Sequence, residues 1–420
     1  MLIQSTNLYK NLQKRYSRRI NLDLSRINKV LFKLKNPHLA LKNPINILGS
    51  DGKMSVLTSL KHFLHAEKKY ITAFTSPHLV ELKERFWLKN KYISLKEIKK
   101  FTKIVESTKL DLTLFELLTC VYILAAKEKK NISYNLIESG LLFKKDSTNL
   151  WISPRAQIVT NINFQHQEWI KPKTIEEICR QKVGFLSKNS TIYVAPQEKK
   201  TLLIIKKILK ENPSKKVYSS SWKIIHKKNK LFYKDRNFTI PIKTNRIFSE
   251  GLISNLCLSI KVALDLGVKK ETIMKTIPKI EFEGRVQYIK KGKLKKILGK
   301  NEQLIIDGCH SIKSASNLYN YLKTLDKPIY GIWGMKKNKL PLNFIKSFNN
   351  IFKKIITITI PNEPSAIKSK DLKKIVEKCG NKSETALDIK QALKKCSCNQ
   401  KKIVVVFGSL YLAGYALRKN

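Results

Sequence analysis

A glycine-bearing loop with a lysine and a serine is the part of the sequence that could bind a phosphate. The run "INILGSDGKMS" passes from the apolar residues 45–48 into this loop, and a helix can begin directly after it. The candidate residues are Gly49, Asp51, Gly52, Lys53 and Ser55. A strand-to-helix turn of this kind points backbone N–H groups at an anion, while a lysine adds charge and a hydroxyl can ligate Mg²⁺. The spacing differs from G-x-x-x-x-G-K-[ST], because Ile47 stands where the first glycine belongs and Met54 follows the lysine. Taken alone, the loop is either a phosphate site or a plain turn.

Other polar residues follow apolar runs in the same way. Ser76 comes after residues 70–74, Glu138 ends the run 134–138, and His166 follows the run 156–162. In open α/β sheets, ligands bind beyond the carboxyl ends of the strands. A carboxylate beside a phosphate loop is where Mg²⁺ would need an oxygen ligand. Each residue has a plain explanation alone, a helix cap for the serine and a structural role for the histidine, but together they indicate one site.

The elements that would position these residues alternate between β-branched runs and longer helical patterns, which is typical of a parallel α/β sheet. In the first block, the predicted strands cover 45–48, 70–74, 134–138, 156–162 and 191–195, and the predicted helices cover 53–66, 94–107, 113–130 and 251–266. Residues 217–242 break this rhythm with short alternating pieces, which predict a small antiparallel meander.

The rhythm restarts after the turn at Gly284 and Arg285. The predicted strands there cover 303–307, 329–333, 355–360 and 402–407, and the predicted helices cover 311–324, 341–350, 369–378, 385–395 and 409–418. We therefore predict an α/β protein of two domains. Residues 1–282 would form a P-loop-type, mostly parallel sheet with helices on both faces and the meander, and residues 283–420 would form a Rossmann-like α/β domain. A length of 420 residues agrees with two or three domains.

The net charge of +52 arises from 83 basic and 31 acidic residues. Only 11 of the basic residues are arginines, which leaves 72 lysines spread over almost every segment. Arginine is the residue suited to bidentate phosphate and base recognition, so this excess indicates compositional bias more than a nucleic-acid-binding stripe. A nucleic-acid-binding protein stays as a remote alternative, and it would show a steep salt dependence of binding.

The cysteines and the apolar runs bear on the compartment. The seven cysteines form no C-x-x-C pair and have no histidine at zinc spacing, which predicts unpaired thiols in a reducing compartment. A metal at Cys396 and Cys398 is a less favoured alternative. The longest apolar run, residues 403–417, is interrupted by glycines and too short to span a membrane. We predict a soluble, cytoplasmic monomer that binds neither membrane nor nucleic acid.

Motifs in the order of the chain show a resemblance to a known family. The chain resembles the bifunctional dihydrofolate synthase/folylpolyglutamate synthase family of the Mur ligase superfamily. The family loop G-T-N-G-K-G-S corresponds to "GSDGKMS", T-S-P-H-L with E-R to "TSPHLVELKER", F-E-x-x-T to "FELLT", and E-V-G-x-G-G-x-x-D-x-T-N to "ESGLLFKKDSTN". T-N-I-x-x-D-H corresponds to "TNINFQH", I-A-x-x-K-A-G-I to "ICRQKVGFL", G-R to Gly284-Arg285, D-G-A-H-N-P to "DGCHSI", and G-S-L-Y-L-A-G to the identical run at 408–414. The matches span nearly the whole chain.

The resemblance implies an ATP-dependent amide ligase that adds L-glutamate to dihydropteroate, to folate polyglutamates, or to both. The γ-phosphate of ATP would pass to a substrate carboxylate, and an amino group would attack the resulting acyl phosphate, with ADP and phosphate released. The first domain would be a Mur-ligase-like ATP-binding domain, and the second would bind glutamate. Closure of the domains would complete the site.

The resemblance also assigns roles to residues. Those implied to bind ATP are Gly49, Asp51, Gly52, Lys53, Ser55, Arg285, Asp307 and His310. Those implied to bind two Mg²⁺ ions are Ser55, Ser76, Glu138, His166 and Lys182. The catalytic residues would be Lys53, His166 and Lys182. Carbamylation would turn Lys182 from an ammonium donor into an oxygen ligand, which is how a lysine can serve in a Mg²⁺ site.

The chain departs from the family pattern close to these residues. Met54 stands for a glycine, Leu142 and Phe143 for a glycine pair, Gln165 for an aspartate, and Ser311 and Ile312 for Asn-Pro. These departures keep two alternatives open: a catalytically weakened homologue that binds nucleotide or folate without ligation, and a Mur-type ligase with another acceptor.

Overall fold

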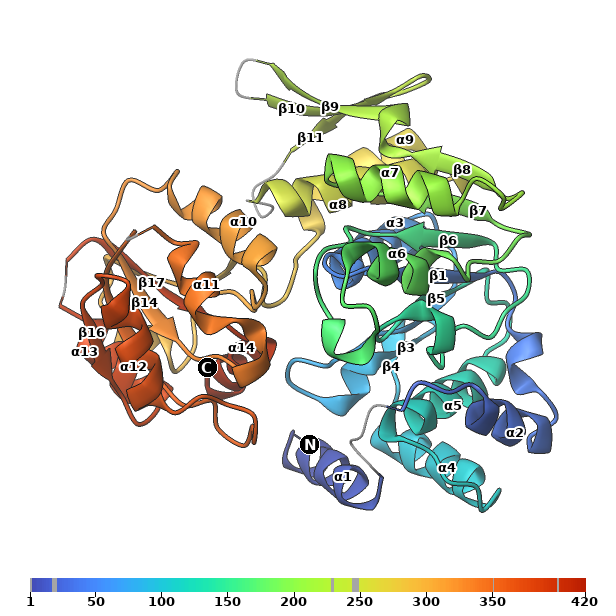
Figure 1. Ribbon diagram of the computed structural model, residues 1–420, viewed down its shortest axis with the longest axis horizontal. Coiled ribbons are helices and arrows are strands. Elements are labelled where there is room, and N and C mark those ends of the chain that lie inside the picture. The colour runs from blue at the N-terminus through green and yellow to red at the C-terminus, as the bar shows by residue number, and fades with distance from the viewer. Residues whose placement is uncertain (1, 17–20, 228–229, 244–248, 350, 399) are drawn as a thin grey trace. The chain divides into compact units, whose positions relative to one another are not determined.

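The computed structural model of the chain forms two compact units (Figure 1). The structure describes all residues except 1, 17–20, 228–229, 244–248, 350 and 399. The first unit comprises the described residues of Met1–Lys243 and Ser254–Ile280, and the second comprises 249–253 and the described residues of Glu281–Asn420. Helix α8 (Glu250–Asp265) crosses from one to the other, because its first residues belong to the second unit.

The first unit is built on an eight-stranded sheet in the order β4-β3-β2-β5-β1-β6-β7-β8. Its strands are β1 (Pro44–Leu48), β2 (Ile71–Phe74), β3 (Phe86–Leu88), β4 (Lys91–Tyr92), β5 (Tyr134–Glu138), β6 (Ala156–Val159), β7 (Thr191–Val194) and β8 (Lys215–Tyr218). The strands from β2 to β8 in this order run parallel, and only β3 and β4 pair antiparallel. Every residue of β1 is buried, as expected for a strand covered on both faces. The predicted mostly parallel sheet is confirmed.

The helices of the first unit pack with this sheet in separate apolar cores. They are α1 (Leu2–Arg15), α2 (Ser25–Lys33), α3 (Lys53–Ala66), α4 (Leu95–Glu106), α5 (Leu114–Lys127), α6 (Ile175–Val183), α7 (Lys199–Ile208), α8 and α9 (Lys270–Thr276). Helices α4 and α5 share a core with β2 and β3, whereas α6 and α7 share one with β6 and β7. Capping boxes fix the starts of α4 and α5, where Ser94 pairs with Glu97 and Thr113 with Glu116. The order of strands and helices brings the carboxyl ends of β2, β5, β1 and β6 side by side.

The predicted meander begins later than expected. The prediction started it at residue 217, but β8 belongs to the large sheet, where it pairs parallel with β7. The meander consists of β9 (Trp222–Lys227), β10 (Lys230–Asp235) and β11 (Thr239–Ile242), all antiparallel. Residues 228–229 of the predicted meander lie outside the described residues.

The second unit is an open α/β sheet in the order β12-β13-β17-β14-β15-β16. Its strands are β12 (Gln287–Ile289), β13 (Glu302–Ile306), β14 (Ile329–Trp333), β15 (Phe352–Thr357), β16 (Ser383–Thr385) and β17 (Lys402–Phe407), and its helices are α10 (Ile312–Leu322), α11 (Pro341–Lys346), α12 (Ser369–Lys378), α13 (Ile389–Cys396) and α14 (Leu410–Lys419). Only β12 runs antiparallel. The predicted helix 341–350 ends at Lys346, and the predicted helix 385–395 begins at Ile389 because β16 precedes it.

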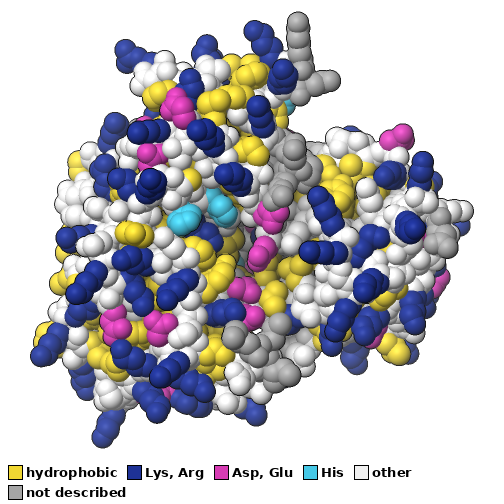
Figure 2. Space-filling model, turned by 180° about the vertical axis from the view of Figure 1, so that it is seen from behind, with side chains coloured by type: hydrophobic (Ala, Val, Ile, Leu, Met, Phe, Trp, Pro, Cys, Tyr) yellow, Lys and Arg dark blue, Asp and Glu magenta, His cyan; other side chains and the backbone are white. Residues whose placement is uncertain are grey.

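Basic side chains are dispersed on the face of the molecule that Figure 2 shows, and the cysteines are unpaired. Figure 2 shows lysine and arginine side chains spread over the visible face of both units and not gathered in one patch. All seven cysteines are free thiols, as predicted. Within the described ranges, no helix has the length and apolar character needed to cross a membrane.

Candidate active site

The loop after β1 is held in a conformation that requires its glycines. Gly49 has φ 137° and Gly52 has φ 92°, values that side chains with a Cβ rarely adopt. A Cβ on Gly49 would lie only 2.1 Å from Oγ1 of Thr160. The backbone N–H groups of Ser50 and Asp51 both donate to the carbonyl of Asn161, at 2.8 and 3.2 Å. The loop is therefore fixed between the end of β1 and the segment that follows β6, and Gly52 leads directly into α3.

Two lysines converge on the carbonyl oxygen of Gly49. Lys53 Nζ donates to the carbonyls of Gly49 and Ser50, each at 3.2 Å. Lys182 Nζ, from α6, donates to the carbonyls of Gly49 and Leu141, each at 3.0 Å. The Lys182 side chain is fully buried. The structure thus brings two predicted catalytic residues, 129 positions apart in the chain, to the same loop atom.

The surroundings of Lys182 disfavour its charged form. Burial, and then the positive charge of Lys53, lower the pKa of Lys182 to about 7, although the carboxylates of Asp146 and Asp51 oppose the shift. A lysine with a pKa near neutrality has a substantial fraction of neutral amine under physiological conditions. Lys182 Nζ donates its hydrogen bonds to backbone oxygens. Because Mg²⁺ takes oxygen ligands, Lys182 could bind that ion only if its side chain carried an oxygen atom.

Glu138 and Ser76 meet at the ends of neighbouring strands. Glu138 is the last residue of β5, which lies between β2 and β1, and its side chain is buried. Its Oε2 accepts from the backbone N–H of Ser76 at 3.0 Å. Ser55, in the first turn of α3, is buried as well. Carboxylate and hydroxyl oxygens suit Mg²⁺, so the types of these residues fit that ion. Among the described residues, no three His, Cys, Asp or Glu side chains gather as a metal-binding cluster.

His166 lies on a turn that is tied to the phosphate loop through its neighbours. It has φ 64° and precedes the short 3-10 helix Gln167–Trp169. The side-chain amides of Asn163 and Gln165 both donate to Oδ2 of Asp51, at 2.7 and 3.1 Å. The carboxylate in the loop therefore holds the segment that carries His166.

A separate group of predicted residues comes together inside the second unit. The carboxylate of Asp307, just after β13, accepts from the backbone N–H groups of Val286 and Cys309, both at 2.7 Å. His310 Nδ1 lies 2.9 Å from the carbonyl of Gly308. The guanidinium of Arg285 also packs on Gly308, where a Cβ would lie 3.1 Å from its terminal nitrogen. Arg285, Asp307 and His310 thus surround one glycine.

Three of the departures from the family pattern are accommodated locally. Leu142 and Phe143 are buried in the core that contains α6, and neither has a positive φ, so this turn does not require the glycine pair. Ser311 caps α10, because its hydroxyl accepts from the backbone N–H of Ser314 at 3.1 Å. These substitutions fit the backbone on which they occur.

Asn255 is a residue near the loop that the sequence reasoning missed. Its side-chain amide lies 2.6 to 2.9 Å from the position that a Cβ on Gly52 would take. A single asparagine within the apolar helical run "LISNLCLSI" was the available signal. The residue places a polar group from α8 beside the start of α3.

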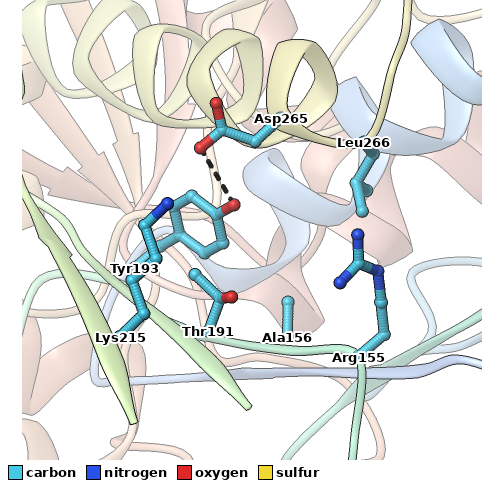
Figure 3. A pocket seen from close by; sticks show the side chains of 7 residues that line it. All are labelled: Arg155, Ala156, Thr191, Tyr193, Lys215, Asp265 and Leu266. Carbon is cyan, nitrogen blue, oxygen red and sulfur yellow. Dashed lines mark hydrogen bonds between the residues drawn. The ribbon is translucent and has the colours of Figure 1, made fainter.

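A cavity of about 270 Å³ lies at the amino-terminal ends of the strands of the same sheet (Figure 3). Its lining includes Ala156, Thr191 and Lys215, which are the first residues of β6, β7 and β8, whereas the phosphate loop follows the carboxyl end of β1. One wall is fixed by Tyr193, whose hydroxyl donates to Asp265 at 3.0 Å. The cavity is therefore not part of the candidate site.

A loop of this kind in a mostly parallel sheet, followed by a second open α/β sheet, defines a two-domain α/β protein with a P-loop-type first domain. Known proteins are similar to this chain over nearly its whole length. The family "Dihydrofolate synthetase, C-terminal domain" matches residues 290–419. Dihydrofolate synthetase of Saccharomyces cerevisiae is 24% identical over 435 residues, which cover 95% of this chain and 98% of the yeast protein.

Solved structures show the same fold. The E. coli FolC structure in complex with DHPP and ADP superposes with a TM-score of 0.85 at 20% identity, covering 98% of this chain and 96% of that one. The bifunctional folylpolyglutamate synthase/dihydrofolate synthase of Yersinia pestis, complexed with AMPPNP and a Mn ion, gives a TM-score of 0.84 at 18% identity, covering 98% and 97%. The chain is thus similar to dihydrofolate synthase/folylpolyglutamate synthase proteins over nearly its whole length, and residues 290–419 match the C-terminal domain family of dihydrofolate synthetase.

Proposed function

We propose that the protein is an ADP-forming ligase that uses ATP to join L-glutamate to dihydropteroate, to a folate, or to both. The observation that carries this proposal is the arrangement around the phosphate loop. Lys53 and Lys182 meet at the carbonyl of Gly49, while the carboxylate of Glu138 holds Ser76 at the adjoining strand end. This arrangement places the Lys53 ammonium, the Lys182 amine and oxygen ligands on neighbouring elements, and phosphoryl transfer needs cations and metal ligands in such proximity.

The reaction needs activation because an unactivated carboxylate is a poor electrophile. The bond between the β,γ-bridging oxygen and the γ-phosphorus of ATP breaks, and the phosphoryl group forms a bond to a carboxylate oxygen of the folate substrate. The amino group of glutamate then attacks the acyl carbon, and phosphate leaves as the amide forms. The backbone N–H groups of Ser50 and Asp51 are already donated to Asn161, so the N–H groups at the start of α3 and the Lys53 ammonium stabilise charge on the β- and γ-phosphates. Gly49, Asp51, Gly52 and Ser55 shape the loop around them.

Two Mg²⁺ ions fit the donor types at this site. Ser55, Ser76 and Glu138 would hold one ion, and His166 with Lys182 would hold the other. Mg²⁺ supplies charge that neutralises the crowded phosphate oxygens. For Lys182 the role requires carbamylation, and its pKa of about 7 supports this because the neutral amine is the form that reacts with CO₂.

The remaining assignments concern the nucleotide and the setting of the reaction. Arg285, Asp307 and His310 are proposed as nucleotide-binding residues, and the second unit is proposed to bind glutamate. The protein acts as a cytoplasmic monomer without nucleic acid or membrane. The spread of basic side chains in Figure 2 and the seven free thiols support this setting.

Glutamate-dependent release of ADP tests the activity. Purified protein with Mg·ATP and L-glutamate is given dihydropteroate in one reaction and a reduced folate in another. We expect ADP release with at least one acceptor, and the acceptor that works distinguishes dihydrofolate synthase from folylpolyglutamate synthase activity. Lys53→Ala should abolish turnover, whereas Lys96→Ala, which removes an exposed charge on α4, should not. No acceptor-dependent turnover above Lys53→Ala would refute the proposal.

Carbamylation of Lys182 has its own test. Protein incubated with ¹³C-bicarbonate should give a carbamate carbon resonance that is absent from Lys182→Met. The same resonance in both proteins would place the carbamate elsewhere, and its absence from the wild type would exclude this role for Lys182.

A further inference from the structure

Asp51 joins the phosphate loop to the turn carrying His166, next to the hydroxyl of Ser50, which exchanges hydrogen bonds with the backbone of Asn163. Its Oδ2 accepts from Asn163 Nδ2 at 2.7 Å and from Gln165 Nε2 at 3.1 Å, and its backbone N–H donates to the carbonyl of Asn161. Gln165 is 9% exposed, so its amide is largely removed from water. A hydrogen bond from an amide to a carboxylate is stronger than one between neutral groups.

The carboxylate and the amide of this contact stand at opposite positions in this chain and in the family pattern. That pattern has an amide at the third loop position, G-T-N-G-K-G-S, and a carboxylate before the histidine, T-N-I-x-x-D-H. This chain has the carboxylate at 51 and the amide at 165. The substitution at 165 therefore does not delete a negative charge from the site, since Asp51 supplies one across a single hydrogen bond.

We propose that Asp51 and Gln165 are a compensated pair in which Asp51 supplies the site's carboxylate and Gln165 positions it. The inference rests on the proposed function. Two carboxylates at this separation would repel each other, and one of them would have to take up a proton or move away. Two amides would keep a hydrogen bond but lose the charge. Only one carboxylate with one amide provides both, and either direction satisfies this requirement.

The direction of the pair can be reversed without a change in side-chain size. Asp51→Asn and Gln165→Glu are each isosteric, so all members of the cycle occupy the same space. In the double variant the nitrogen of the amide introduced at position 51 takes the place of Oδ2, and it can donate one hydrogen to the carboxylate at 165 and the other to the side-chain oxygen of Asn163 once that amide has flipped. Such a cycle isolates the coupling between the two positions.

The variants should separate nucleotide binding from turnover. Asp51→Asn removes negative charge beside a polyanion, so ADP should bind at least as tightly while kcat falls. Gln165→Glu adds negative charge, so both ADP affinity and kcat should fall. We expect each single variant to lower kcat about tenfold or more and the double variant to return to within a few-fold of the wild type. A merely structural role would weaken ADP binding in Asp51→Asn, in step with the loss of stability.

The experiment measures kcat, KM for ATP, ADP affinity by calorimetry and urea unfolding for the wild type and the three variants. Recovery of kcat in the double variant, beyond the product of the two single effects, supports the pair. If the wild type turns over but the double variant is no better than the product of the single effects, the inference is wrong while the proposed function stands. If the wild type does not turn over with any acceptor, the proposed function fails, and the cycle of unfolding free energies still decides the pair. Additive changes in the free energy of unfolding would then refute it.

Discussion

Gly49→Ala should damage the phosphate loop more than its small size suggests. The residue has φ 137°, and the added Cβ would lie 2.1 Å from Oγ1 of Thr160 and 3.1 Å from the Thr160 carbonyl group. Thr160 is completely buried, and its hydroxyl donates to the carbonyl of Leu48 at 3.1 Å. The side chain of Thr160 would have to turn away and lose that hydrogen bond, or the loop would have to move.

The loss of unfolding free energy in Gly49→Ala is the sum of three contributions, and a control variant separates one of them. A positive φ in a residue with a Cβ costs about 1 to 2 kcal/mol, a lost hydrogen bond about 1 kcal/mol, and overpacking about 1 kcal/mol or more. We therefore expect Gly49→Ala to lower the free energy of unfolding by about 3 to 4 kcal/mol. Gly267 also has a positive φ, 82°, but a Cβ there would have no neighbour within 4 Å. Gly267→Ala should thus show the backbone contribution alone, about 1 to 2 kcal/mol.

Urea unfolding and ADP calorimetry on both variants measure the difference. Both glycines belong to the first unit, so the same unfolding transition reports on each. Gly49→Ala should lose stability and at least tenfold in ADP affinity, whereas Gly267→Ala should keep wild-type affinity. Adding Thr160→Ala to Gly49→Ala should recover part of the lost stability, because it removes the clashing oxygen. Equal effects of the two glycine substitutions would show that contact with Thr160 does not constrain the loop.

Three further substitutions test other parts of the structure. Burial alone would raise the pKa of Glu97, but hydrogen bonds from Ser94 and Lys129 lower it to about 2. A depressed pKa stabilises the fold above the ordinary value of 4.5 and is lost as the pH falls toward 2, so Glu97→Gln should cost about 1 kcal/mol in urea unfolding at pH 7 and progressively less below pH 4.5. The buried Lys402 ammonium lies 3.3 Å from the Glu302 carboxylate. Glu302→Gln would remove this charged partner and should lower the free energy of unfolding of the second unit by about 3 to 5 kcal/mol. A loss below about 1 kcal/mol would contradict a stabilising ion pair. Met54→Gly should leave kcat unchanged or raise it, despite a helix-propensity cost of about 1 kcal/mol, and a loss of ADP affinity would show that Met54 faces the nucleotide.

The central elements of the fold could be predicted because their patterns are strong and local. Helix α3 covers the predicted 53–66, and β5 and β17 have their predicted bounds, since apolar runs end at glycine or polar residues there. The strands that escaped prediction, β3, β4, β12 and β16, are two or three residues long and lie at or next to sheet edges. Strands this short carry little periodicity. The error at β8 has a similar cause, because that strand directly precedes the meander and its pattern merges with it.

The candidate site could also be predicted only in part from the sequence. Residue type and order along the strands indicated the loop and the strand-end ligands, because parallel strands bring their carboxyl ends together. The contacts themselves depend on tertiary packing. The sequence does not reveal that Lys182 reaches the carbonyl of Gly49, that Gln165 donates to Asp51, or that Asn255 lies beside Gly52.

The lysines show why packing, rather than residue type, identifies function in this chain. A lysine whose ammonium leaves water must pair with a carboxylate, bond to oxygens, or lose its charge. Lys402 pairs with the carboxylate of Glu302. Lys182 has only backbone carbonyls as hydrogen-bond partners among the contacts described, and the charge of Lys53 acts against its ammonium. The lowered pKa of Lys182 is thus a consequence of where α6 places it, and an amine that is neutral near pH 7 is the form required for carbamylation. Among 72 lysines of similar sequence context, burial beside the phosphate loop makes this one chemically distinct.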